Sequence, residues 1–136
     1  MPDDSAQSLT LVLECDLPAS LESVWRALTE QTLIEQWLMP NDFEPIVDRS
    51  FNLVGDWGTV ECKVLRAVPG KLLAYTWAAF GLDIIVECTL SQSKTGTLLK
   101  VVQSGFKPDQ QQFYDGAQGG WQQFLGKLEQ VVVSLK

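Results

Sequence analysis

Two polar residues, a tyrosine and a glutamine, lie on the face of a predicted antiparallel sheet that points towards the protein interior. Side chains two residues apart share a face of a strand, so Tyr75 lies on the face of Trp77 and Gln103 on the face of Val101. A buried phenol or amide without a hydrogen-bond partner costs about 1–3 kcal/mol, so each needs a protein partner, a water or a ligand. Tyr75 and Gln103 are therefore the candidate polar contacts in an otherwise apolar space.

The same strand faces, with one face of a predicted C-terminal helix, supply side chains that could enclose a small molecule. Aromatic residues line apolar ligand cavities as well as cores, and the chain holds five Trp and six Phe. Two interpretations stay open: these residues bind a hydrophobic or lipid-like ligand, or they form a packed core whose polar groups are satisfied. The candidate ligand-binding residues are Tyr75, Trp77, Val86, Cys88, Leu99, Val101, Gln103, Trp121, Phe124 and Leu125.

The chain contains no histidine. This excludes Ser-His-Asp and Cys-His catalysis, most zinc sites and the commonest general base near neutral pH. The carboxylates closest in sequence, Asp42 with Glu44 and Asp3 with Asp4, fall in a predicted loop and at the terminus. We therefore predict no catalytic residue, no metal site and no cofactor, and we expect a protein that is not an enzyme.

Charge and cysteine content limit the partners and the compartment. The net charge is −7, and the ten Lys and Arg are scattered, whereas a nucleic-acid-binding module carries a basic stripe. Three cysteines, an odd number without C-x-x-C spacing, are typical of buried thiols in a reducing compartment. The N-terminus lacks the pattern of a secretory signal, and no apolar run approaches the ~20 residues of a membrane span. We expect a cytoplasmic protein with no nucleic-acid partner and no membrane insertion.

The elements that would position the site follow from periodicity. Alternation predicts a strand over 9–15, and Ser20 is a credible N-cap for a helix that ends near Leu28. A second short helix is predicted from Thr32 to Leu38, before Pro40. From Pro45 to Phe106 the pattern predicts an antiparallel meander of hairpins, giving about six or seven strands in all.

A long amphipathic helix is predicted at the C-terminus. Its apolar stripe recurs at helical spacing and can be buried only against the sheet. Gly116, Gly119 and Gly120 are expected at its entry, and the segment 107–119 is expected to be a connector, or a lid over a cavity mouth. The chain is thus predicted to be one α+β domain over 9–136, after a disordered N-terminus at 1–8. The stripe is Trp121, Phe124, Leu125, Leu128, Val131, Val132 and Leu135.

This order of elements resembles the helix-grip superfamily (SRPBCC, or START-like), which includes START lipid-transfer domains, polyketide cyclases and the birch pollen allergen. Val24-Trp25-Arg26-Ala27-Leu28-Thr29 is similar to a Val-Trp-x-Ala-Leu-Thr signature, and Trp37 with Pro40 is similar to Trp-x-x-Pro. Gly58-Thr59-Val60, Leu73-Ala74-Tyr75-Thr76-Trp77 and Gly120-Trp121 follow in the expected order. Together they resemble the family named for the activator of heat-shock protein 90 ATPase, homologue 1-like.

The resemblance implies a helix-grip fold: a curved sheet around the long helix, with two short helices after the first strand. The family often carries His where this chain has Gln103, so any acid–base or metal role of that His is absent here. The expected function is non-catalytic binding of a hydrophobic small molecule. Two alternatives stay open: a co-chaperone-like module with a chaperone partner of the heat-shock protein 90 class, and a cyclase/aromatase-type enzyme. A monomer and a homodimer are both compatible with the sequence.

Overall fold

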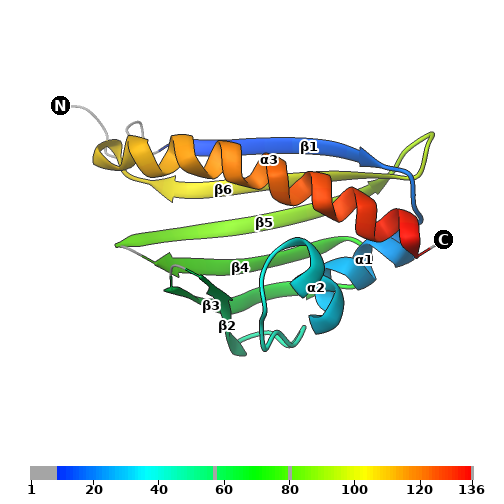
Figure 1. Ribbon diagram of the computed structural model, residues 1–136, viewed down its shortest axis with the longest axis horizontal. Coiled ribbons are helices and arrows are strands. Elements are labelled where there is room, and N and C mark those ends of the chain that lie inside the picture. Colours follow the sequence, from blue (N-terminus) through cyan, green and yellow to red (C-terminus); the bar gives the residue numbers. More distant parts are fainter. Residues whose placement is uncertain (1–8, 57, 80, 136) are drawn as a thin grey trace.

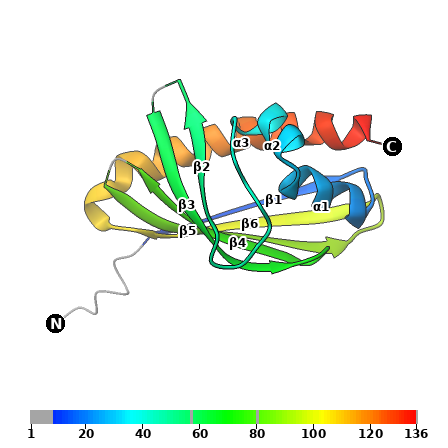
Figure 2. The same cartoon turned by 90° about the horizontal axis from the view of Figure 1, so that it is seen from below.

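Three α-helices lie on one face of a curved antiparallel sheet (Figures 1 and 2). The structure, a computed structural model, describes residues 9–56, 58–79 and 81–135; the predicted disorder of residues 1–8 lies outside them. The described residues form an open sheet of six strands in the order β1-β6-β5-β4-β3-β2, so the predicted α+β class and antiparallel meander are confirmed. The strands are β1 Leu9–Leu17, β2 Ser50–Gly55, β3 Gly58–Val68, β4 Leu72–Ala79, β5 Leu82–Gln92 and β6 Thr97–Phe106.

Pairing of the central strands confirms the predicted alternation. Tyr75 in β4 is opposite Val86 in β5, and Val86 is in turn opposite Gln103 in β6. All three side chains are buried on the face that the helices cover. Strand β1 is one of the two edge strands of the sheet, and it pairs along its whole length with β6.

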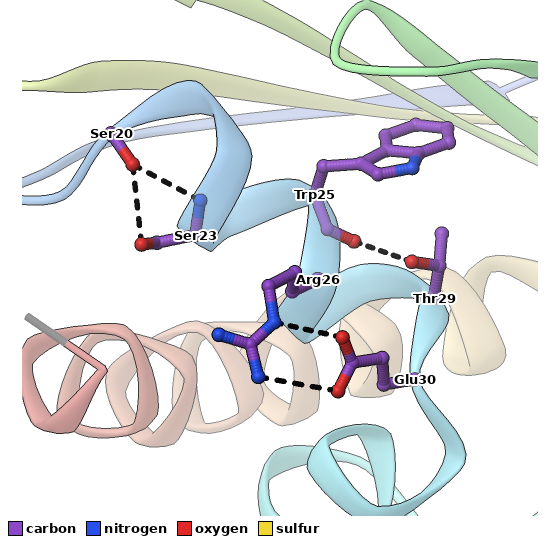
Figure 3. Close-up of polar contacts among 6 residues, drawn as sticks. All are labelled: Ser20, Ser23, Trp25, Arg26, Thr29 and Glu30. Carbon is purple, nitrogen blue, oxygen red and sulfur yellow. Dashed lines mark hydrogen bonds and ion pairs between the residues drawn. The ribbon is translucent and has the colours of Figure 1, made fainter.

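The first helix, α1 (Leu21–Thr29), forms where a serine precedes an apolar face. The side chain of Ser20 accepts a hydrogen bond from the Ser23 backbone N–H at 3.1 Å, which confirms the predicted N-cap (Figure 3). At the other end Arg26 and Glu30 form an exposed ion pair at 2.8 Å, and the Thr29 hydroxyl donates to the Trp25 carbonyl at 2.7 Å. The cap therefore fixes where the chain turns back over the sheet.

Helix α2 (Gln31–Trp37) is one residue earlier at each end than predicted. Its buried face includes Ile34 and Trp37. The Trp37 indole N–H donates a buried hydrogen bond of 2.8 Å to the Ala27 carbonyl, which joins α2 to α1. The two short helices therefore pack as one unit over the end of the sheet where β4 begins.

The C-terminal helix α3 runs from Gln111 to Ser134, so the predicted connector at 107–119 is wrong. The segment forms a 3₁₀ turn at Pro108–Gln110 and then the first turns of α3. The sequence does not predict these first turns because they contain Gly116, Gly119 and Gly120, and glycine is a poor helix former. Trp121, Leu125, Leu128, Val131 and Val132 of the predicted stripe are buried.

The start of β6 packs closely against the backbone of the residues that precede α1. The Thr97 hydroxyl, fully buried, donates to the Ala19 carbonyl at 2.8 Å. Gly96 has φ +154°, and a Cβ there would lie 2.6 Å from the Ala19 nitrogen and would also overlap the Leu17 carbonyl. Only glycine fits this crossing.

Replacing Gly96 with alanine should lower the free energy of unfolding by more than about 2 kcal/mol, because backbone atoms would have to move apart. The matched control is Gly70→Ala, which also has a positive φ (+74°) but no atom within 4 Å of the added Cβ. It should cost about 1 kcal/mol from backbone strain alone. Urea unfolding of both variants is the measurement; equal losses would contradict the close packing at Gly96.

Candidate functional site

A cavity of about 510 Å³ lies between the sheet and the first half of α3. It occupies the end of the sheet where the β4–β5 hairpin, the end of β6 and the start of α3 come together, on the left of Figure 1. Ala79 and Leu82 contribute from the hairpin, and Phe106 from the end of β6. The volume falls within the ~300–1,000 Å³ of pockets that hold drug-sized ligands.

Trp121 is the centre of an aromatic cluster in the wall. Its ring centroid lies 5.8 Å from that of Trp77 and 5.5 Å from that of Phe124, with the Phe124 ring edge-on. A third neighbour, Trp37, lies behind it at 6.1 Å. These contacts hold Trp121 in one orientation, so the wall is formed before any ligand arrives.

Gln103 contributes an amide to this wall and is 1% exposed. Neither its Oε1 nor its Nε2 has a hydrogen-bond partner among the described residues. The cause lies in the register: the residues opposite Gln103 on the neighbouring strands are Leu11 and Val86, both apolar and buried. The sheet therefore offers no side-chain partner to this amide.

The first half of α3 forms the roof and the mouth. Gly116, Ala117 and Gly120 line the cavity without filling it. Phe113, also in the wall, is 42% exposed, and Gln112 beside it is exposed. The cavity therefore reaches the surface beside the first turns of α3.

No charged side chain is among the described residues of the wall. Apart from Gln103 at the floor and Gln112 at the mouth, its residues are apolar, aromatic or glycine. The lining residues are Met39, Trp77, Ala79, Leu82, Ile84, Gln103, Phe106, Gln112, Phe113, Gly116, Ala117, Gly120, Trp121 and Phe124.

Four of the residues expected from the sequence meet at this cavity: Trp77, Gln103, Trp121 and Phe124. Val86, Leu99, Val101 and Leu125 are buried in the core instead. They share the inner face, but two residues along a strand span about 7 Å. Val101 and Leu99 precede Gln103 by two and four residues, so they lie further from the cavity end of β6. Val86 is opposite Gln103 in the sheet but does not line the cavity.

Tyr75 and Cys88 line a separate void of about 10 Å³, no larger than one water needs. The Tyr75 ring packs edge-on against Phe51 at 5.4 Å. Burial raises the pKa of the Tyr75 phenol well above its ordinary value. The structure thus separates the two polar groups that alternation had placed in one space.

Sequence reasoning missed most of the roof and the hairpin. Phe113 and Ala117 precede Trp121 by eight and four residues, which is the spacing of one helix face. Extending the stripe backwards across the glycines would have found them. Leu82 and Ile84 follow from the alternation of β5 once its start at Leu82 is known.

Two further findings concern what the described residues do not contain. No group of three or more Cys, Asp or Glu among them is placed to hold a metal ion. No helix in the described part of the chain is long and apolar enough to cross a membrane.

Comparison with solved structures gives close matches over nearly the whole chain. The protein MLL2253 from Mesorhizobium loti is 45% identical, with a TM-score of 0.91 over 94% of this chain and 99% of that one. A protein from Bacillus halodurans is 24% identical, with a TM-score of 0.83 over 93% and 99%. DynU16, from the dynemicin biosynthetic locus, is 24% identical, with a TM-score of 0.80 over 99% of this chain and 49% of that one. The last two matches show the fold alone.

A search of curated proteins found no match. The family model described as Activator of Hsp90 ATPase homolog 1-like protein matches residues 18–133. That range includes α1, α2, five of the six described strands and all but the last residue of α3. The chain therefore belongs to the Activator of Hsp90 ATPase homolog 1-like family, and it has that family's helix-grip fold.

Proposed function

We propose that this protein binds an uncharged, hydrophobic small molecule in the cavity under α3 and does not convert it chemically. The observation that carries the proposal is a space of about 510 Å³ with a preformed aromatic wall, whose described lining residues include none that is charged. Burial of apolar ligand surface contributes roughly 25 cal/mol per Å². A cavity of this kind therefore favours binding without any catalytic group.

The roof provides a route for entry. Gly116, Gly119 and Gly120 each weaken the helix by about 1 kcal/mol relative to alanine. Alanine would be accommodated, since a Cβ at each position meets nothing within 4 Å. The part of α3 over the cavity is thus its least stable part, and its transient opening admits the ligand.

The thiols are poor nucleophiles, which supports a non-catalytic role. Burial raises the pKa of Cys62 and of Cys88 to about 12, and that of Cys15 to about 11. Only the thiolate is reactive, so these groups are almost wholly protonated near pH 7. All three are free cysteines, and we include a cytoplasmic location in the proposal on that ground.

Two other functions draw less support. A co-chaperone role rests on the family description, since the proteins are named as like an activator of an Hsp90 ATPase; unchanged ATPase turnover of the cognate chaperone on adding this protein would remove it. A cyclase-type enzyme would need a proton-transfer group at the ligand. Without histidine, that group would be Tyr75, a buried Glu or a Cys, and no Tyr, Glu or Cys is among the described residues that line the cavity. Tyr75 lines the small void instead.

We expect wild-type protein to bind N-phenyl-1-naphthylamine, a neutral apolar fluorophore, with an increase in dye fluorescence. Replacing Ala117 with phenylalanine should weaken that binding at least about tenfold, because the larger ring takes up cavity space. The measurement is a fluorescence titration of each protein.

Gly126→Ala is the matched control, since Gly126 is a glycine of the same helix that lies outside the cavity wall, and a Cβ there meets nothing within 4 Å. It should bind the dye as wild type does and unfold at a higher temperature. Absence of binding to wild type, or equal binding by the Ala117 variant, would contradict the proposed site.

The buried thiols predict a pH dependence of stability. Cys62 and Cys88 ionise near pH 9 in the unfolded chain but near 12 in the folded one. The unfolded state therefore releases protons first, and the free energy of unfolding should fall as pH rises above about 9. Below pH 9 this contribution is fully present.

The double variant Cys62→Ala/Cys88→Ala should show a shallower fall between pH 9 and 11 in urea unfolding. Val60→Ala, which truncates another buried side chain of β3 without removing a titrating group, should keep the wild-type slope. Identical slopes for wild type and the double variant would show that these thiols ionise freely in the folded protein.

A further inference from the structure

We infer that the cavity selects ligands that carry a neutral amide with its donor and acceptor on one edge, as in a lactam, and that Gln103 recognises this edge. The inference rests on the proposed function and names the class of ligand. It starts from the one amide in the wall whose oxygen and nitrogen are both buried without a partner among the described residues.

The chemistry of the glutamine side chain defines the complement. Its oxygen accepts and its NH₂ group donates, and the two lie on one edge of a planar group. Such an edge pairs with a second edge that presents one donor and one acceptor, as glutamine does with adenine in DNA. Both atoms are buried in this structure, so the Gln103 side chain must turn towards the cavity to be reached. A lactam N–H would then donate to Gln103 Oε1, and the lactam oxygen would accept from Nε2. This pairing satisfies both orphaned atoms at once.

The surroundings of Gln103 exclude the other polar ligands. None of the described residues that line the cavity is Lys, Arg, Asp or Glu, so a carboxylate, phosphate or ammonium would lose its hydration without gaining a counter-charge from them. A hydroxyl or a ketone can satisfy one of the two amide atoms well but leaves the other without a full partner. A neutral cis-amide on an apolar frame meets both requirements.

The aromatic cluster indicates the shape of that frame. The ring centroids of Trp77 and Phe124 lie 5.8 and 5.5 Å from that of Trp121, and aromatic walls of this kind favour flat ring systems. Leu82, Ile84 and Phe106 add apolar side chains to the same cavity wall. The predicted ligand is therefore a flat, largely apolar ring system with one lactam edge.

The test compares phenanthridinone, a planar lactam, with its N-methyl derivative, which keeps the rings and the acceptor but lacks the donor. Affinities are measured by quenching of tryptophan fluorescence, in wild type and in Gln103→Met, a variant of similar length without amide atoms. Wild type should bind phenanthridinone at least about tenfold more tightly than the N-methyl compound. In the variant this preference should disappear, while the affinity for the N-methyl compound should change by less than about threefold.

Equal binding of the two compounds by wild type would overturn the inference. A preference that persists in Gln103→Met would overturn it too, because it would then arise from the bulk of the methyl group. A variant that is more stable than wild type and equally selective would show that the amide is only an unsatisfied or hydrated core group. If Gln103→Met does not fold, Gln103→Leu has the same expected outcome.

The two proposals fail in different ways. Binding of N-phenyl-1-naphthylamine without binding of phenanthridinone would overturn the ligand class and leave the apolar site standing. Binding of neither compound by wild type would overturn both.

Discussion

The structure depends on how much of α3 the sheet can bury. A helix of 24 residues is about 36 Å long, and a strand of ten residues spans about 33 Å, so α3 extends over the full length of β6. From Trp121 onwards the helix carries large apolar residues, and Leu125, Leu128, Val131 and Val132 are buried in the core. Before Trp121, Tyr114 packs edge-on against Phe106 of β6. Over the cavity, however, the helix carries the small residues Gly116, Ala117 and Gly120. The cavity is the direct consequence of this change in side-chain size along one helix.

The polar content of the cavity follows from a second mismatch, in the sheet. Alternation in β6 forces Gln103 to the inner face, where its cross-strand neighbours are apolar. A leucine there would fill the same space without an unsatisfied amide, so the glutamine lowers stability unless something pairs with it. Helix α3 leaves room for a ligand at the same end of the sheet. The proposed binding function rests on these two features together.

Much of the fold was predictable because it rests on local periodicity. Short stretches of sequence determine the Ser20 cap, the β-meander and the alternation of inward-facing residues. The start of α3 was predicted too late: the segment 107–119 was expected to be a connector or a lid, whereas the helix begins at Gln111. Tertiary position overrode the low helix propensity of the glycines there: these residues continue a helix whose second half is fixed by packing.

The site was predictable only in part, for a related reason. Alternation identified the face, and so it found Trp77 and Gln103, but it does not say how far along a strand a cavity extends. The separation of Tyr75 from Gln103 depends on where α2 and the first turns of α3 lie over the sheet. That separation depends on packing between segments that are distant in sequence. The two-residue repeat of a strand and the 3.6-residue repeat of a helix do not predict it.

The most direct test of the central claim is native mass spectrometry of the protein purified from the cells that make it. The account predicts a single small adduct that is released on denaturation and is absent from the Ala117→Phe variant purified in parallel. Because the wall is uncharged, the released molecule should be neutral in solution near pH 7. A wild-type protein found only at its polypeptide mass would contradict the claim that the cavity is a site for a resident ligand.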